Sequence, residues 1–228
     1  MEITLFILLS IIILENHLKE ISTGKIMVVN GLLLGLAANT RPETYLFAGL
    51  YYLTTLWLLR SSIRQNLPKL FLSAGIFILL VLPYPVFCYV YTGGFLPNTY
   101  EGQVGSAKYL PNFTYIIESS KIFIKDNFIV FMLWGLSALY FIRSIIKRKI
   151  DKNFLLIYLW IFLLPLISSF IAPNWRHHGR YLIPLIPFIN ISAIFILRKL
   201  YLYYSTGRHS RAELYRKIAF ALILIASI

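Results

Sequence analysis

The sequence predicts an all-α membrane protein, a polytopic transmembrane helix bundle of about eight spans with a long extracytoplasmic loop that carries an interfacial helix. Hydrophobic residues make up 58% of the 228 residues, and the mean hydropathy is +0.72, whereas soluble domains contain about 45–50% apolar residues. These residues form blocks of about 12 to 24, the length that crosses a hydrocarbon core of about 30 Å. Helices are the default in lipid because each satisfies its own backbone hydrogen bonds.

The apolar blocks define the predicted spans, which cover residues 3–14, 26–40, 44–59, 70–92, 127–146, 153–172, 181–202 and 218–228. The first and the last are short for a span. We therefore expect a single transmembrane domain, residues 1–228, that is the C-terminal portion of a longer membrane module. The single cysteine, Cys88, excludes an intrachain disulfide and a cysteine metal cluster.

The basic residues predict the orientation, because cytoplasmic loops are rich in Lys and Arg. Sixteen of the 22 fall on one side when alternate loops are grouped: Lys19, Lys25, Arg60, Arg64, Lys69, Arg143, Lys147, Arg148, Lys149, Lys152, Arg198, Lys199, Arg208, Arg211, Arg216 and Lys217. The other side receives Arg41, Lys108, Lys121, Lys125, Arg176 and Arg180. The first side is predicted to be cytoplasmic. The net charge of +13 then needs no nucleic acid as partner, because juxtamembrane cations attract anionic membrane lipid.

The first outward segment, residues 38–44, contains Arg41, Pro42 and Glu43 between two apolar helices. Pro42 disfavours helix at the residue before it and fits the first turn of the next helix, so the segment is predicted to reverse the chain sharply. An ionisable residue near the membrane is a hypothesis of function. Alternatively, Arg41 extends to lipid headgroups and Glu43 favours the N-terminus of its helix.

The second outward segment, residues 93–127, is long and aromatic, which favours a functional loop. Its first part contains Asn98, Tyr100 and Lys108. Its second part predicts a helix in the plane of the interface, because apolar and polar residues fall largely on opposite faces. The apolar set is Phe113, Ile116, Ile117, Phe123 and Ile124, and the polar set is Glu118, Ser119, Lys121 and Lys125.

The third outward segment, residues 173–181, gathers basic and aromatic side chains at a helix start: Trp175, Arg176, His177, His178, Arg180 and Tyr181. Arginine offers a planar fork of donors to phosphate, and an aromatic ring can stack on a sugar. The alternative is an interfacial belt of aromatic and basic residues. No metal site is predicted, because adjacent histidines diverge and a third ligand at a recognisable spacing is missing.

Motifs in these three segments resemble the polytopic glycosyltransferases of the GT-C type that use a polyprenyl-phosphate-linked sugar as donor. Gly31-Leu-Leu-Leu-Gly-Leu-Ala-Ala-Asn-Thr-Arg-Pro-Glu43 is similar to their glycine-spaced helix that ends in an Arg-Pro-Glu turn. Phe95-Leu-Pro-Asn-Thr-Tyr100, followed by Lys108-Tyr109, resembles a loop of the arabinofuranosyltransferase-like members. Arg180-Tyr-Leu-Ile-Pro-Leu-Ile-Pro187 resembles a helix start found late in those proteins.

The resemblance implies transfer of a sugar, at the extracytoplasmic face of the cell membrane, from the polyprenyl-phosphate donor to a glycan, lipid or protein acceptor. The cations expected to stabilise the departing phosphate are Arg41, Arg176 and Arg180, with Lys108. The residues expected to orient donor or acceptor are Asn98, Tyr100, Trp175, His177, His178 and Tyr181. Glu43 either acts as the base or positions Arg41, and the second role is favoured. No cofactor is identified, and dependence on a divalent metal stays open.

One departure from the family is that its catalytic aspartate lies in the first outward loop, whereas no Asp precedes Asp126 in this chain. The general base is therefore expected to be absent. Two alternatives follow, a transporter or flippase for a solute or a lipid-linked sugar, and a non-catalytic membrane subunit. A transporter would use charges within the membrane, and we expect no acidic or basic residue deep in any span.

Overall fold

Residues 2–94, 113–171 and 182–205 are described by a computed structural model. Every element in these ranges is a helix, as predicted. The α-helices are α1 (Glu2–Thr23), α2 (Val29–Ala38), α3 (Thr44–Leu58), α4 (Ile63–Val81), α5 (Pro83–Thr92), α7 (Phe113–Asp126), α8 (Phe128–Ile146), α9 (Leu155–Ile171) and α11 (Ile186–Ser205). Short 3-10 helices, η1 (Lys152–Phe154) and η3 (Ile183–Leu185), precede α9 and α11.

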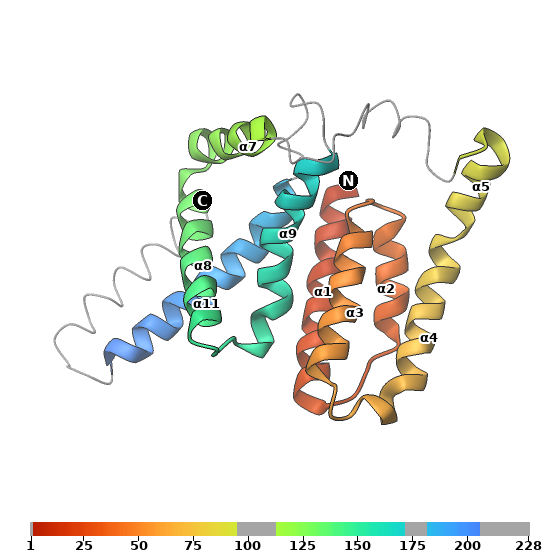
Figure 1. Ribbon diagram of the computed structural model, residues 1–228, viewed down its shortest axis with the longest axis horizontal. Coiled ribbons are helices and arrows are strands. Elements are labelled where there is room, and N and C mark those ends of the chain that lie inside the picture. Colours follow the sequence, from red (N-terminus) through yellow and green to blue (C-terminus); the bar gives the residue numbers. More distant parts are fainter. Residues whose placement is uncertain (1, 95–112, 172–181, 206–228) are drawn as a thin grey trace.

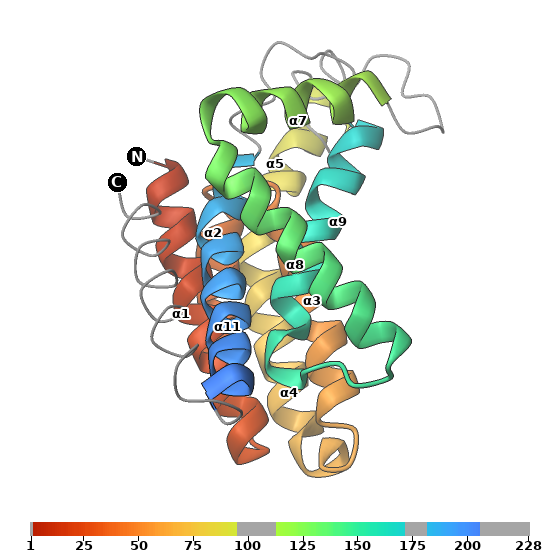
Figure 2. The same cartoon turned by 90° about the vertical axis from the view of Figure 1, so that its left-hand side faces the viewer.

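The helices form two groups that lie side by side, α1 to α5 and α7 to α11 (Figure 1). Successive long helices run in opposite directions. The α2–α3 turn, the end of α5 and helix α7 consequently lie at one end of the molecule, which we call the upper end. The α1–α2 and α3–α4 turns lie at the opposite, lower end (Figures 1 and 2). Two of the three segments predicted to share one side therefore have described parts at the same end of the bundle.

Within the described ranges, three helices are long and apolar enough to cross a membrane: residues Ile63–Thr92, Phe128–Ile146 and Lys152–Phe170. The first of them, made of α4 and α5, leaves most of its large apolar side chains exposed, a surface that suits lipid rather than water. The helical membrane character of the chain is thus supported. The count of eight spans stays a prediction, because α2 has 10 residues and is only about 15 Å long.

Helix α1 corrects the prediction of a short first span at residues 3–14. It continues to Thr23 and takes up the polar residues that follow the apolar run. On its exposed side Glu15 and Lys19 form an ion pair of 2.7 Å one turn apart. Its other side buries polar groups against α2 and α3. Lys19 was predicted to lie in a loop, which is wrong.

Helix α4 begins at Ile63, before the predicted start at residue 70, and includes Pro68 near its N-terminus. Arg64 and Lys69 therefore lie in a helix rather than in the predicted loop. Pro68 lies beyond the first turn, so the amide that it lacks removes one intrahelical hydrogen bond, that to the Arg64 carbonyl. The basic residues still gather at the lower end, where α4 starts (Figure 1).

The core where the two groups of helices meet is built around Trp160 of α9, which is fully buried. Its ring lies 5.0 Å from that of Phe47 in α3, and 6.2 Å from the rings of Phe6 in α1 and Phe188 in α11, measured between ring centroids. Aromatic pairs at such separations contribute more than their buried area alone. One side chain thereby ties four helices together across the junction.

Helices α2 and α4 pack closely through Gly31 and Gly35, which lie one helical turn apart on α2. A Cβ atom on Gly31 would collide with the backbone carbonyl of Ser73. One on Gly35 would come within 2.6 Å of the side chain of Leu80. Small residues at this spacing let helix backbones approach in a membrane, where no hydrophobic force drives helices together. The glycine spacing thus has a packing role.

The helix predicted in the second outward segment is present as α7, which crosses the upper ends of α8 and α9 at a steep angle (Figure 1), and its place in a membrane interface stays a prediction. Tyr115, Ser119 and Phe123 are buried against the bundle, whereas Ile117 and Ile124 are exposed. Ser119 was expected on the polar outer face, and its burial corrects that expectation. The outer face thus carries isoleucines beside the exposed Lys121 and Lys125, a combination of apolar and basic side chains that suits a lipid headgroup layer.

Candidate functional site

Arg41 and Glu43 form a charged pair at the upper end, in the turn between α2 and α3. The Arg41 Nη2 and Nε atoms donate to the two carboxylate oxygens of Glu43, at 2.6 Å and 3.1 Å. The side chains are only 11% and 7% exposed. Such a bidentate pair fixes the plane of the guanidinium. The geometry supports the positioning role of Glu43, because both of its oxygens accept from Arg41.

The turn that holds this pair is built from short-range backbone hydrogen bonds and one long-range contact. The Arg41 amide donates to Ala37 O at 3.0 Å, which continues the last turn of α2. The Asn39 side-chain amide donates to Gly35 O at 2.9 Å and to Leu80 O at 3.2 Å. The second bond ties the turn to α4, so the Arg41–Glu43 pair is anchored to three helices.

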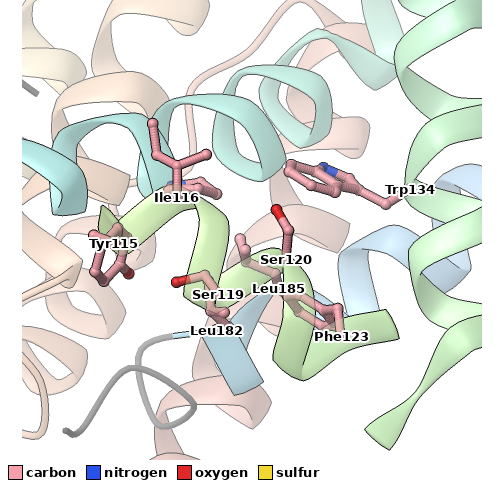
Figure 3. Close-up of a pocket in the computed structure, with 9 residues that line it drawn as sticks. Tyr115, Ile116, Ser119, Ser120, Phe123, Trp134, Leu182 and Leu185 are labelled. Carbon is pink, nitrogen blue, oxygen red and sulfur yellow. The ribbon is translucent and has the colours of Figure 1, made fainter. Parts of the chain in front are cut away.

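A small cavity lies beneath α7, at the same end of the molecule (Figure 3). It is lined by Tyr115, Ile116, Ser119, Ser120, Phe123, Trp134, Pro165, Leu182 and Leu185. Its volume of about 30 Å³ holds a water molecule or two and is far below the roughly 300 Å³ of a small ligand site. Ser119 Oγ is buried without a hydrogen-bond partner among the described residues, and a water there would satisfy it.

The remaining predicted site residues lie outside the described ranges. They are Asn98, Tyr100, Lys108, Trp175, Arg176, His177, His178, Arg180 and Tyr181. Arg41 and Glu43 are the members of the predicted site that the structure places. They lie next to each other at the end of the bundle that also carries α7 (Figure 1), and their shared location with the others stays a prediction.

Sequence reasoning missed a buried polar cluster near the lower end, which we call the Glu20 cluster (Asn16, His17, Glu20, Asn30 and Tyr51). Glu20 is 0% exposed and His17 is 1% exposed. Burial among helices is not depth in a membrane, so the expectation that no acidic or basic residue lies deep in any span stays a prediction. A sequence signal existed, because Asn16, His17 and Glu20 recur at helical spacing opposite Glu15 and Lys19.

The Glu20 carboxylate is the centre of this cluster. The Tyr51 hydroxyl donates to its two oxygens at 2.8 Å and 2.9 Å. The Met27 amide and the Asn30 side-chain amide donate to Oε1 at 2.7 Å and 3.1 Å. The Met27 bond lies just before α2, whose own N-terminal residue supplies no side-chain cap. Glu20 thus takes the place of that cap and joins α1, α2 and α3.

The other members of the cluster extend it in two directions. His17 Nδ1 lies 3.4 Å from Glu20 Oε2, and its Nε2 lies 3.4 Å from Thr54 Oγ1 in α3. The Asn16 side-chain amide donates to Asn30 Oδ1 at 2.9 Å. A buried charge is tolerated only when it is paired and hydrogen-bonded, and these contacts meet that requirement. The cluster therefore holds α1, α2 and α3 together.

The described helices offer no cluster of three or more His, Cys, Asp or Glu side chains that can hold a metal ion. The candidate site in these ranges therefore consists of the Arg41 guanidinium, whose orientation is fixed by its two hydrogen bonds to Glu43. No protein-family model, no curated protein and no solved structure matches this chain.

Proposed function

We propose that the chain is a membrane glycosyltransferase, or part of one, that takes a sugar from a polyprenyl-phosphate donor and transfers it to an extracytoplasmic acceptor. The observation that carries the proposal is the Arg41–Glu43 pair. A guanidinium with its plane fixed by a carboxylate, nearly withdrawn from the surface at the end of a helix bundle, suits the phosphate of a lipid whose chain lies in the membrane.

The reaction defines what such a cation does. The acceptor hydroxyl oxygen forms a bond to the anomeric carbon, and the bond from that carbon to the phosphate oxygen breaks. The polyprenyl phosphate leaves with the electron pair of the broken bond, and the hydroxyl proton passes to a base. Arg41 stabilises the charge that develops on the leaving phosphate. Glu43 is assigned to positioning, and the base is not among the residues assigned here.

The test is the binding of a long-chain polyprenyl phosphate by the full chain in lipid nanodiscs, compared with the polyprenol that lacks the phosphate. Wild-type protein is expected to prefer the phosphate. Arg41→Ala is expected to weaken phosphate binding by about 10- to 100-fold, the worth of a hydrogen bond to a charged group. Glu43→Gln, which keeps the size of the side chain and removes its charge, is expected to cause a smaller loss.

Arg60→Ala is the matched control, because Arg60 is an exposed arginine at the other end of α3. Its affinity should equal that of the wild type. If Arg41→Ala binds the phosphate as tightly as Arg60→Ala, the phosphate role of Arg41 is wrong. A transfer assay with polyprenyl-phosphate-linked pentose and hexose on the same preparations then tests the second half of the proposal, release of polyprenyl phosphate on addition of acceptor.

One observation favours the transporter alternative, the ionisable pair His17 and Glu20 inside the helix bundle, since such residues often mark transport pathways. The hydrogen bonds of Glu20 to α2, to the Met27 amide just before α2, and to α3 favour the structural role instead. Proteoliposomes with a fluorescent lipid-linked sugar decide between them. Movement of the label to the opposite leaflet that depends on Glu20 in a protein of unchanged stability would replace the transferase by a flippase.

A further inference from the structure

Helix α3 has an open position at Gly49, on the face that it turns away from the core. Gly49 is exposed, and a Cβ atom added to it would meet nothing within 4 Å. Gly31 and Gly35 of α2 differ from it, because both are in close contact with α4. Gly49 is therefore not required for helix packing. A glycine here leaves a gap on a surface that is otherwise covered by side chains.

The register of α3 shows which neighbour this gap faces. Tyr45 lies four residues before Gly49 and Tyr52 three residues after it, so the three share one side of the helix. The Tyr52 hydroxyl lies 3.2 Å from Ser73 Oγ of α4, and its ring lies 6.2 Å from that of Phe77. This side of α3 consequently borders α4, and the gap lies along that border, above the Tyr52 contacts.

The gap also lies directly along the helix from the candidate phosphate site. Glu43 immediately precedes α3, and Gly49 follows six residues later, about 9 Å along the helix axis. Below Gly49 the same side continues with the exposed apolar residues Leu53 and Leu56. A phosphate at Arg41 would therefore have a continuous apolar surface beneath it, beginning with the gap at Gly49.

We propose that this surface of α3, from Gly49 to Leu56, holds the hydrocarbon chain of the phosphate-bearing lipid whose phosphate is bound at Arg41. The inference rests on the proposed function, because it takes the phosphate at Arg41 as its starting point. The occupant is a long unsaturated polyprenyl chain, held by van der Waals contact with the α3 surface. The gap at Gly49 admits a branch methyl close to the helix backbone, where a side chain would exclude it.

The test replaces Gly49 by leucine and compares a long-chain polyprenyl phosphate with dimethylallyl phosphate, whose five-carbon chain is too short to reach Gly49, about 9 Å along the helix axis. The nanodiscs contain phosphatidylcholine in excess, so ordinary phospholipid competes throughout. Gly49→Leu is expected to weaken binding of the long-chain phosphate by about fivefold and to leave binding of dimethylallyl phosphate unchanged. The substitution has the space it needs, and leucine is the better helix former, so folding is preserved.

Gly75→Leu and Gly135→Leu are the matched controls, because both glycines are exposed on long helices and have equally open surroundings. Both are expected to bind the long-chain phosphate as the wild type does. If Gly49→Leu resembles them while Arg41→Ala loses binding, the chain site is overturned and the proposed function stands. An equal loss for both phosphates in Gly49→Leu also overturns it. Wild-type binding by Arg41→Ala removes the proposed function and this inference together.

Discussion

Glu20→Ala is expected to destabilise the protein by about 4 kcal/mol, a large part of the total stability of a typical domain. The substitution removes the acceptor for the buried Tyr51 hydroxyl and Asn30 side-chain amide, and for the part-buried Met27 amide. Each buried donor without a partner costs about 1–3 kcal/mol. For a chain of this length the apparent melting temperature should fall by about 10 °C.

The measurement is the fraction of monodisperse protein in detergent after heating, followed by size-exclusion chromatography. Glu15→Ala is the matched control, since Glu15 lies on the same helix but is exposed and pairs with the exposed Lys19. An exposed pair of this kind contributes about 0.5 kcal/mol or less. Glu20→Gln, which retains one acceptor oxygen, should fall between the two. Equal apparent melting temperatures for Glu20→Ala and Glu15→Ala would contradict the conclusion that the Glu20 cluster holds the three helices together.

Gly31→Ala is expected to destabilise the protein by about 3 kcal/mol, because the added methyl group meets the backbone of α4 rather than a movable side chain. Ser73 C lies within 2.7 Å of the position that the methyl carbon would take. The helices α2 and α4 have to separate to admit it, and the Tyr52–Ser73 contact would be lost with them. The change is chemically the smallest that a glycine allows.

A series of Gly→Ala variants turns this into a ranking. Gly35→Ala should cost less than Gly31→Ala, since it meets the side chain of Leu80, which can shift. Gly75→Ala should be neutral or stabilise by up to about 1 kcal/mol, because its surroundings are open and alanine is the better helix former. Thermal unfolding of the three variants under one condition tests the order. A Gly31→Ala protein as stable as Gly75→Ala would show that close packing of α2 on α4 is wrong.

The sequence predicted the elements that depend on local pattern. The helix of α7 follows from apolar residues at helical spacing. The reversal at Pro42 follows from the backbone restrictions of proline, and α2 ends and α3 begins on either side of it. The closeness of Arg41 and Glu43 follows from their separation of two residues. That they form a bidentate pair nearly withdrawn from the surface depends on how the turn packs on α4, and no local pattern specifies it.

The prediction for α1 failed for a physical reason. Counting apolar residues ended the first span at Leu14, because Glu15, Asn16 and His17 follow it. A helix continues through polar residues when their groups find partners, and those partners lie in α2 and α3. Asn30 and Tyr51 are 10 and 31 residues away from Glu20. Each of these two residues lies in an apolar segment, and nothing in that segment alone indicates that it contacts Glu20.

By itself the sequence predicted helices long and apolar enough to cross a membrane, because length and hydropathy belong to each segment alone and a backbone in lipid has to satisfy its own hydrogen bonds. Only the tertiary structure decided which side of each helix meets another. That choice buries Glu20 among three helices, presses Gly31 against Ser73 and leaves Gly49 open. The reason is that rotation and depth of a helix are set by its neighbours, through contacts between residues far apart in the chain.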